Sequence, residues 1–94
     1  MQGIKHIEGA ASVEATLRAL LVDVLGLPAA RVAAFDNDTE LFGALPEFDS
    51  LAVATLLTGL EERLAILIED DDVEAEDFAT FGRLLSFATR KALH

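Results

Sequence analysis

The sequence predicts an all-α domain made of three longer helices and one short helix. Apolar residues recur every three or four positions in three separate segments, which is the spacing that places them on one face of a helix. No segment shows the apolar and polar alternation of a half-buried strand. The 94 residues are 52% hydrophobic, which is enough for one core but too little to divide between two domains.

The N-terminal segment is expected to lie outside the fold. Residues 1–11, MQGIKHIEGAA, show no sustained apolar period and include two glycines. We therefore expect a flexible tail over residues 1–11 and a single domain over residues 12–94.

The first helix is expected to begin at Ser12 and to end near Leu25. Ser12 is the predicted N-cap, because its hydroxyl can accept a hydrogen bond from a free backbone amide of the first turn. Gly26 can take the left-handed conformation that ends a helix, and Pro28 prevents the helix from continuing. The predicted core-facing residues are Val13, Leu17, Leu20, Leu21 and Val24.

Residues 27–49 form a long connection between the first two helices. This segment holds both prolines and a turn cluster at residues 36–39, but it also contains many apolar residues. We therefore expect a packed crossover with one helical turn at residues 29–34.

The second helix is expected to run from Asp49 to about Ile66. Its predicted core stripe is Val53, Leu57, Leu60 and Leu64, with Leu56 on the flank. The opposite, exposed side then carries Leu51, Ala54, Thr55, Thr58 and Glu62. Gly59 inside this helix indicates either close helix packing or simple tolerance, and the sequence leaves both open.

The chain closes with an acidic segment and a last helix. Residues 69–77 hold seven acids in nine positions and are expected to form a short helix with Val73 and Phe78 inward. Thr80 is the predicted N-cap of the last helix, whose apolar repeat is Phe81, Leu84, Leu85 and Ala88 and which ends at Arg90 and Lys91. The predicted interior includes Leu57, Leu60, Leu64, Phe78, Phe81 and Leu84.

Charge and composition narrow the range of functions. The chain has 17 acidic and 7 basic residues, a formal charge of −10, so it would be repelled by nucleic acid and by anionic membranes and would favour basic partners. No apolar run approaches a membrane span, and no signal peptide is apparent, so a cytoplasmic, soluble protein is expected. With no cysteine, disulfides and cysteine-based zinc sites are excluded.

Self-contained catalysis is not expected. The two histidines, His6 and His94, lie near the chain ends, so a Ser-His-acid triad or a helix-borne histidine pair would lack its members. The carboxylates lie in runs typical of a solvated face, rather than in an apolar pocket that would raise a pKa.

A calcium loop is a weaker alternative. Asp36, Asp38, Glu40 and Glu47 fall at positions 1, 3, 5 and 12 of an EF-hand-length loop. Leu41 occupies the sixth position, where the loop needs glycine, so no metal site is predicted.

Asp49-Ser50-Leu51 lies where the crossover turns into the second helix. A serine at a helix start is most often a cap. Here an apolar-to-acidic track leads away from Ser50 along the exposed side of the helix, which suits a partner with an apolar pocket and basic residues. The predicted docking residues are Asp49, Leu51, Ala54, Thr58, Glu61 and Glu62.

Over about residues 12–92 the sequence resembles the acyl carrier proteins. The resemblance rests on Asp49-Ser50-Leu51, Leu60-Glu61-Glu62-Arg63-Leu64 with Ile66, the acidic segment, and Ala79-Thr80-Phe81-Gly82, in that order. It implies a four-helix bundle with a long crossover between the first two helices and a short third helix. It also implies that the protein is not an enzyme.

What the resemblance implies for Ser50 is the attachment of a 4′-phosphopantetheine arm. A separate phosphopantetheinyl transferase would transfer the arm from coenzyme A with Mg²⁺. The terminal thiol would carry acyl or aminoacyl groups as thioesters to and from loading and unloading enzymes, with the carrier a monomer. The competing interpretation is a small acidic helical interaction domain without a prosthetic group, in which Ser50 is only a cap.

Two features depart from the family pattern. Glu47 stands where the family usually has glycine, and Thr55 and Thr58 stand where many fatty-acid-synthesis members have an acid and a methionine. Residues 46–53, PEFDSLAV, are similar to discrete carrier proteins linked to exopolysaccharide or exosortase gene clusters.

Overall fold

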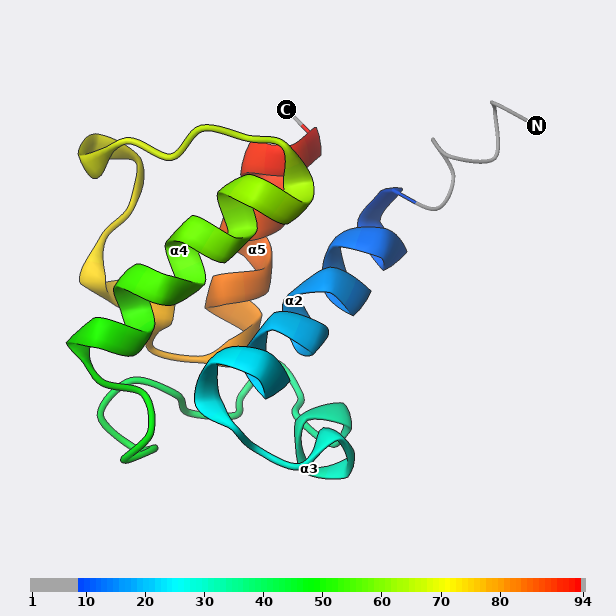
Figure 1. The fold of residues 1–94 in the computed structure, drawn as a ribbon, viewed down its shortest axis with the longest axis vertical. Coiled ribbons are helices and arrows are strands. Elements are labelled where there is room, and N and C mark those ends of the chain that lie inside the picture. Colours follow the sequence, from blue (N-terminus) through cyan, green and yellow to red (C-terminus); the bar gives the residue numbers. More distant parts are fainter. Residues whose placement is uncertain (1–8, 94) are drawn as a thin grey trace.

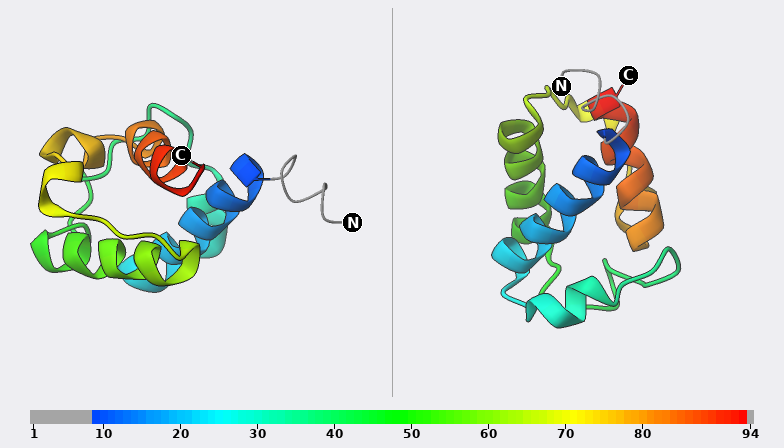
Figure 2. Two further views of the ribbon diagram at one scale, coloured as in Figure 1. Left: turned by 90° about the horizontal axis from the view of Figure 1, so that it is seen from above. Right: turned by 90° about the vertical axis from the view of Figure 1, so that its right-hand side faces the viewer.

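The computed structural model describes residues 9–93, and within this range every named element is helical. The elements are α2 (Gly9–Leu25), α3 (Ala29–Ala33), α4 (Ser50–Leu64), the 3₁₀ turns η1 (Asp70–Asp72) and η2 (Ala75–Phe78), and α5 (Phe81–Leu93). Helix α2 runs opposite to α4 and α5 and packs against both, while the crossover closes one end of the bundle (Figures 1 and 2). The all-α fold class is thereby confirmed.

Helix α2 begins earlier than the sequence indicated. It starts at Gly9, so Ser12 lies within the helix, the predicted N-cap is wrong, and residues 9–11 of the expected tail are helical. The physical reason is that Ala10 and Ala11, the best helix formers, extend the helix towards the N-terminus at no steric cost. The rest of the expected tail, with His6, and also His94 lie outside the described residues.

The end of α2 is as predicted. Gly26 has a φ of +71° and its amide donates to the Val22 carbonyl at 2.9 Å, which closes the last turn in the left-handed conformation that glycine adopts without strain.

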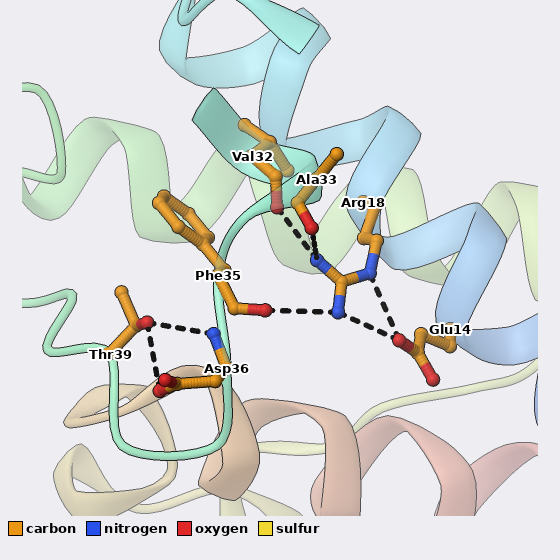
Figure 3. A network of polar contacts seen from close by, with 7 residues as sticks. All are labelled: Glu14, Arg18, Val32, Ala33, Phe35, Asp36 and Thr39. Carbon is orange, nitrogen blue, oxygen red and sulfur yellow. Dashed lines mark hydrogen bonds and ion pairs between the residues drawn. The ribbon is translucent and has the colours of Figure 1, made fainter. Parts of the chain in front are cut away.

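Arg18 of α2 anchors the crossover (Figure 3). Its guanidinium donates to the Val32 carbonyl at 2.7 Å and to the Phe35 carbonyl at 3.1 Å, and it pairs with Glu14 at 2.8 Å. It also lies 4.4 Å from the centroid of the Phe81 ring. One charged group therefore satisfies carbonyls at the end of α3 and ties the crossover to both α2 and α5.

The core register of α4 differs from the predicted stripe. Ala52, Leu56 and Leu60 are buried, whereas Val53, Leu57 and Leu64 are half-buried at the edge of the core. The stripe prediction that Leu56 lies on the flank is therefore wrong. The predicted stripe followed the larger apolar residues along α4. In the structure α4 packs against α2, and the buried side of α4 includes the small residue Ala52.

Close packing explains Gly59. A Cβ placed on Gly59 would lie 2.5 Å from Cδ2 of Leu20, a distance that atoms in contact do not reach. Helices α2 and α4 therefore pack closely at this residue, which resolves the two explanations that the sequence left open.

The acidic segment forms two 3₁₀ turns, η1 and η2, in place of one short helix. The Asp72 carboxylate accepts from the Lys91 ammonium and from the Glu69 amide, each at 2.9 Å. The Lys91 hydrogen bond, together with that of the Glu69 amide, lowers the pKa of Asp72 below its ordinary value. The segment folds back locally because Asp72 and Asp77 each accept a hydrogen bond from the amide three residues earlier, and Asp72 also reaches Lys91 of α5.

Helix α5 begins as expected. The Thr80 hydroxyl accepts from the Arg83 amide at 3.2 Å, and Phe81, Leu84 and Ala88 are buried. Phe87 is also buried although the predicted repeat omitted it. Of the predicted interior, Leu60, Phe78, Phe81 and Leu84 are buried, and Leu57 and Leu64 pack half-buried against them.

Candidate functional site

The junction between the crossover and α4 is organised by Asp49. The Asp49 carboxylate accepts a hydrogen bond from the Ala52 amide at 2.8 Å, so Asp49 is the N-cap of α4. Ser50 follows as the first helical residue and is exposed. Because Asp49 supplies the cap, Ser50 is not needed for it, and its hydroxyl has no hydrogen-bond partner among the described residues.

An apolar cavity of about 200 Å³ lies beside Ser50. Its other lining residues are Phe42 and Val53 on one side and Ala75 and Phe78 of η2 on the other. Phe48 packs edge-to-face against Phe42 and Phe78, with centroids 6.1 and 6.2 Å apart, and so fixes the cavity wall. The junction therefore offers an exposed hydroxyl next to a small apolar recess.

Most of the predicted docking residues lie on the exposed surface of α4 or at its start. Asp49, Leu51, Ala54, Thr58 and Glu62 are exposed, and Leu51 is 75% exposed.

Glu61 differs from the other docking residues. It is half-buried, and its carboxylate accepts from the Ile68 amide at 2.8 Å, which holds the chain just after α4. Glu61 thus has a structural contact that the sequence did not indicate.

The calcium alternative gains no support. The Asp36 carboxylate accepts from the Asp38 amide at 2.9 Å and from the Thr39 hydroxyl at 3.2 Å, so it closes a turn. Within residues 9–93 no three histidine, cysteine, aspartate or glutamate side chains are grouped to hold a metal ion.

Comparison with known proteins identifies the family. The family model of the phosphopantetheine attachment site matches residues 15–87. The chain belongs to the acyl carrier protein family. The solution NMR structure of a holo acyl carrier protein from Nitrosomonas europaea is similar to this carrier protein at 38% identity and a TM-score of 0.75, covering 87% of this chain and 96% of that chain. No curated protein matched the sequence.

The prosthetic group of this acyl carrier protein is a covalently attached 4′-phosphopantetheine. Ser50 and its surroundings fit such a group: Ser50 is exposed, its hydroxyl has no partner in the described part of the chain, and the free amides at the start of α4 favour a phosphodiester. Carrier domains of this kind are not themselves enzymes. No helix within residues 9–93 has the length and apolar character needed to cross a membrane.

Sequence reasoning missed two parts of the site. Phe42 and Ala75 are far apart in the chain, and no periodicity places them beside Ser50. The sequence analysis considered a cap role for Ser50 alone, although aspartate followed by a helix start is itself an N-cap signal and Asp49 supplies the cap.

Proposed function

We propose that Ser50 bears the 4′-phosphopantetheine arm and that the protein carries acyl or aminoacyl groups as thioesters between partner enzymes. The observation that carries this proposal is the exposed Ser50 hydroxyl, which has no hydrogen bond to any residue within 9–93, in the first turn of α4 and within the matched family region. When bound, the arm supplies the thiol that this cysteine-free chain lacks.

The residues around Ser50 present the hydroxyl to an approaching enzyme. Asp49 caps α4 and fixes the direction of its first turn, and Phe48 buries its ring directly before the cap. Ser50 therefore stands on a rigid helix end and not on a mobile loop, while the amides of that end stabilise the charge of a phosphodiester.

Intact mass after incubation with coenzyme A, Mg²⁺ and a broad-specificity phosphopantetheinyl transferase tests the attachment. We expect one adduct on the wild-type protein and none on Ser50→Ala, with the far-UV helical signal retained. Because Asp49 supplies the cap, the alanine variant should lose less than the roughly 1 kcal/mol of a removed cap. Labelling of Ser50→Ala would show that another residue is modified.

Two exposed serines provide internal controls for the assignment. Ser12 and Ser86 lie within α2 and α5 and do not stand at a crossover-to-helix junction. Alanine at either position should leave the adduct unchanged. The family match argues against an interaction domain without a prosthetic group, and absence of any adduct on the wild-type protein would revive it.

We propose that the docking residues recruit basic partner enzymes, namely the transferase and the acyl-loading and acyl-unloading enzymes, to a monomeric cytoplasmic carrier. Exposed charges mainly raise the encounter rate and are screened within about 8 Å at physiological salt. Glu62→Lys should therefore raise the apparent KM for the carrier at low salt, and the difference from wild type should shrink as salt rises. If the KM of Glu62→Lys equals that of wild type at every salt concentration, Glu62 does not contribute to docking.

The link to exopolysaccharide or exosortase clusters stays a prediction from residues 46–53. The test is to purify the carrier protein and ask whether an acyl-loading enzyme encoded next to its gene binds to it and loads it.

A further inference from the structure

A shallow groove of about 490 Å³ runs between α2 and α4 along the edge of the docking residues. Its lining comes from Leu20, Asp23 and Val24 of α2 and from Thr55, Thr58 and Gly59 of α4. The groove is separate from the cavity beside Ser50, since no residue lines both.

The base and the α4 wall of this groove are apolar in character. Gly59 lacks a side chain where Leu20 approaches α4, so the Leu20 side chain occupies the space that a Cβ would take and forms an apolar floor for the groove. The Thr55 hydroxyl donates to the Leu51 carbonyl at 2.9 Å, and the Thr58 hydroxyl donates to the Ala54 carbonyl at 3.1 Å. Both hydroxyls are thus satisfied within α4, and the threonines have methyl groups left to offer to a partner.

The rim of the groove is acidic. Asp23 and Glu62 supply two carboxylates, and Arg63, the cation of the lining, pairs with Asp23 at 2.6 Å. Glu62 has no ion-pair partner among the described residues. Both members of the Asp23–Arg63 pair are substantially exposed, so the pair holds little energy and Asp23 remains open to a competing cation.

The groove lies within reach of an enzyme that acts at Ser50. Thr55 and Gly59 follow Ser50 by five and nine residues along one helix, which is about 8 and 14 Å at 1.5 Å per residue. A typical protein interface covers about 800 Å² on each partner, a patch roughly 30 Å across. A patch of this width that begins at Ser50 and extends along α4 includes the groove, whose lining residue Glu62 lies about 18 Å along the helix.

We infer that the groove receives an apolar side chain of the phosphopantetheinyl transferase, flanked by a lysine or arginine that pairs with Asp23 or Glu62. This inference rests on the proposed function of Ser50 and extends the docking surface from α4 to α2. Asp23 is then a specificity-determining residue that no pattern within α4 indicates.

The proposed binding of the transferase to the groove can be tested by the kinetics of arm transfer from coenzyme A with purified transferase. Two variants outside the docking residues of α4 are compared. Asp23→Lys reverses a rim charge, and Asp38→Lys makes the same charge change at an exposed position of the crossover. The groove predicts an apparent KM for the carrier raised about 3- to 10-fold by Asp23→Lys and less than about 2-fold by Asp38→Lys. The kcat should stay at the wild-type value because the Ser50 junction is unchanged.

A second pair of variants tests the apolar part without changing charge. Thr55→Trp fills the groove, whereas Ala19→Trp adds the same ring to an exposed position of α2 outside it. Thr55→Trp should raise KM and Ala19→Trp should not, with both proteins as helical as wild type. If the two variants of each pair have equal KM values and still take the adduct at Ser50, the groove does not bind the transferase. The assignment of Ser50 as the attachment site would then still stand. A wild-type protein that takes no adduct would overturn the attachment and the groove together.

Discussion

Replacing Gly82 by alanine should destabilise the protein, although helix propensity predicts the opposite. Gly82 lies in the first turn of α5, and its amide donates to the Asn37 carbonyl of the crossover at 3.1 Å. A Cβ at this position would lie 2.8 Å from the Asn37 carbonyl oxygen and 3.0 Å from its Cα. The obstacle is therefore backbone, not the end of a flexible side chain.

The crossover cannot easily move away from such a Cβ. It is tied to the segment before α5 by backbone hydrogen bonds from Leu41 to the Ala79 carbonyl at 2.9 Å, from Phe42 to the Phe78 carbonyl at 3.0 Å, and from Phe81 to the Thr39 carbonyl at 2.8 Å. A shift of Asn37 strains this group of bonds.

The expected magnitude follows from three opposing contributions. Alanine gains about 1 kcal/mol of helix propensity over glycine. Forcing extra volume into a packed contact costs about 1 to 3 kcal/mol, and losing the hydrogen bond to Asn37 costs about 0.5 to 1.5 kcal/mol more. The net loss in the free energy of unfolding is about 0.5 to 3.5 kcal/mol. At about 2 kcal/mol, Tm falls by roughly 8 to 16 °C for a domain of this size.

Urea unfolding followed by far-UV circular dichroism measures this change, with an unchanged m-value as the sign of an unchanged unfolded state. Ser86→Ala, on the exposed side of the same helix, is the matched control and should stay within about 0.5 kcal/mol of wild type. A Gly82→Ala protein more stable than wild type by about 1 kcal/mol would refute the packing argument and leave propensity as the deciding effect.

Three further changes probe the core, the crossover anchor and an ion pair. Leu60→Ala, at a fully buried position, should cost about 2 to 5 kcal/mol, whereas Thr58→Ala on the exposed side should cost less than about 0.5 kcal/mol; similar losses in urea would mean that the α4 register is wrong. Arg18→Met should cost about 1.5 to 3 kcal/mol, because charge-assisted hydrogen bonds to crossover carbonyls are lost, and a thermal melt equal to wild type would contradict this role. Folding lowers the pKa of Asp72, so the ionised carboxylate stabilises the folded protein above the ordinary aspartate pKa near 4, and this stabilisation is lost as pH falls through the lower folded value. Asp72→Asn should therefore be less stable than wild type at pH 7. The difference in the free energy of unfolding, measured in urea, should shrink towards about pH 3.

Several features of the fold follow from local chemistry and were correctly predicted from the sequence. Gly26 ends α2, Thr80 caps α5, and residues 29–33 form a helical turn, because each depends on a backbone conformation or hydrogen bond within a few residues. The exposed track on α4 was also predicted, since the residues opposite an apolar stripe are fixed by 3.6-residue geometry.

Errors arose where burial depends on a partner surface. Ala52, Leu56 and Leu60 are buried because that side of α4 faces α2, whereas the periodicity of α4 alone favoured the neighbouring Val53 and Leu57. Ser12 looked like a cap by residue type, yet the helix had already started at Gly9.

The sequence by itself determined the helical class, the C-terminal end of α2, the start of α5 and the acidic charge, because these depend on spacing and composition along the chain, and its family resemblance pointed to Ser50 as the candidate site. Tertiary structure alone decided that Gly59 and Gly82 are sites of close approach, that Glu61 holds the Ile68 amide, and that an apolar groove opens between α2 and α4. The physical reason is that each of these features joins atoms from segments distant in the chain, whose separation is set by how the helices pack and not by any repeat within one helix.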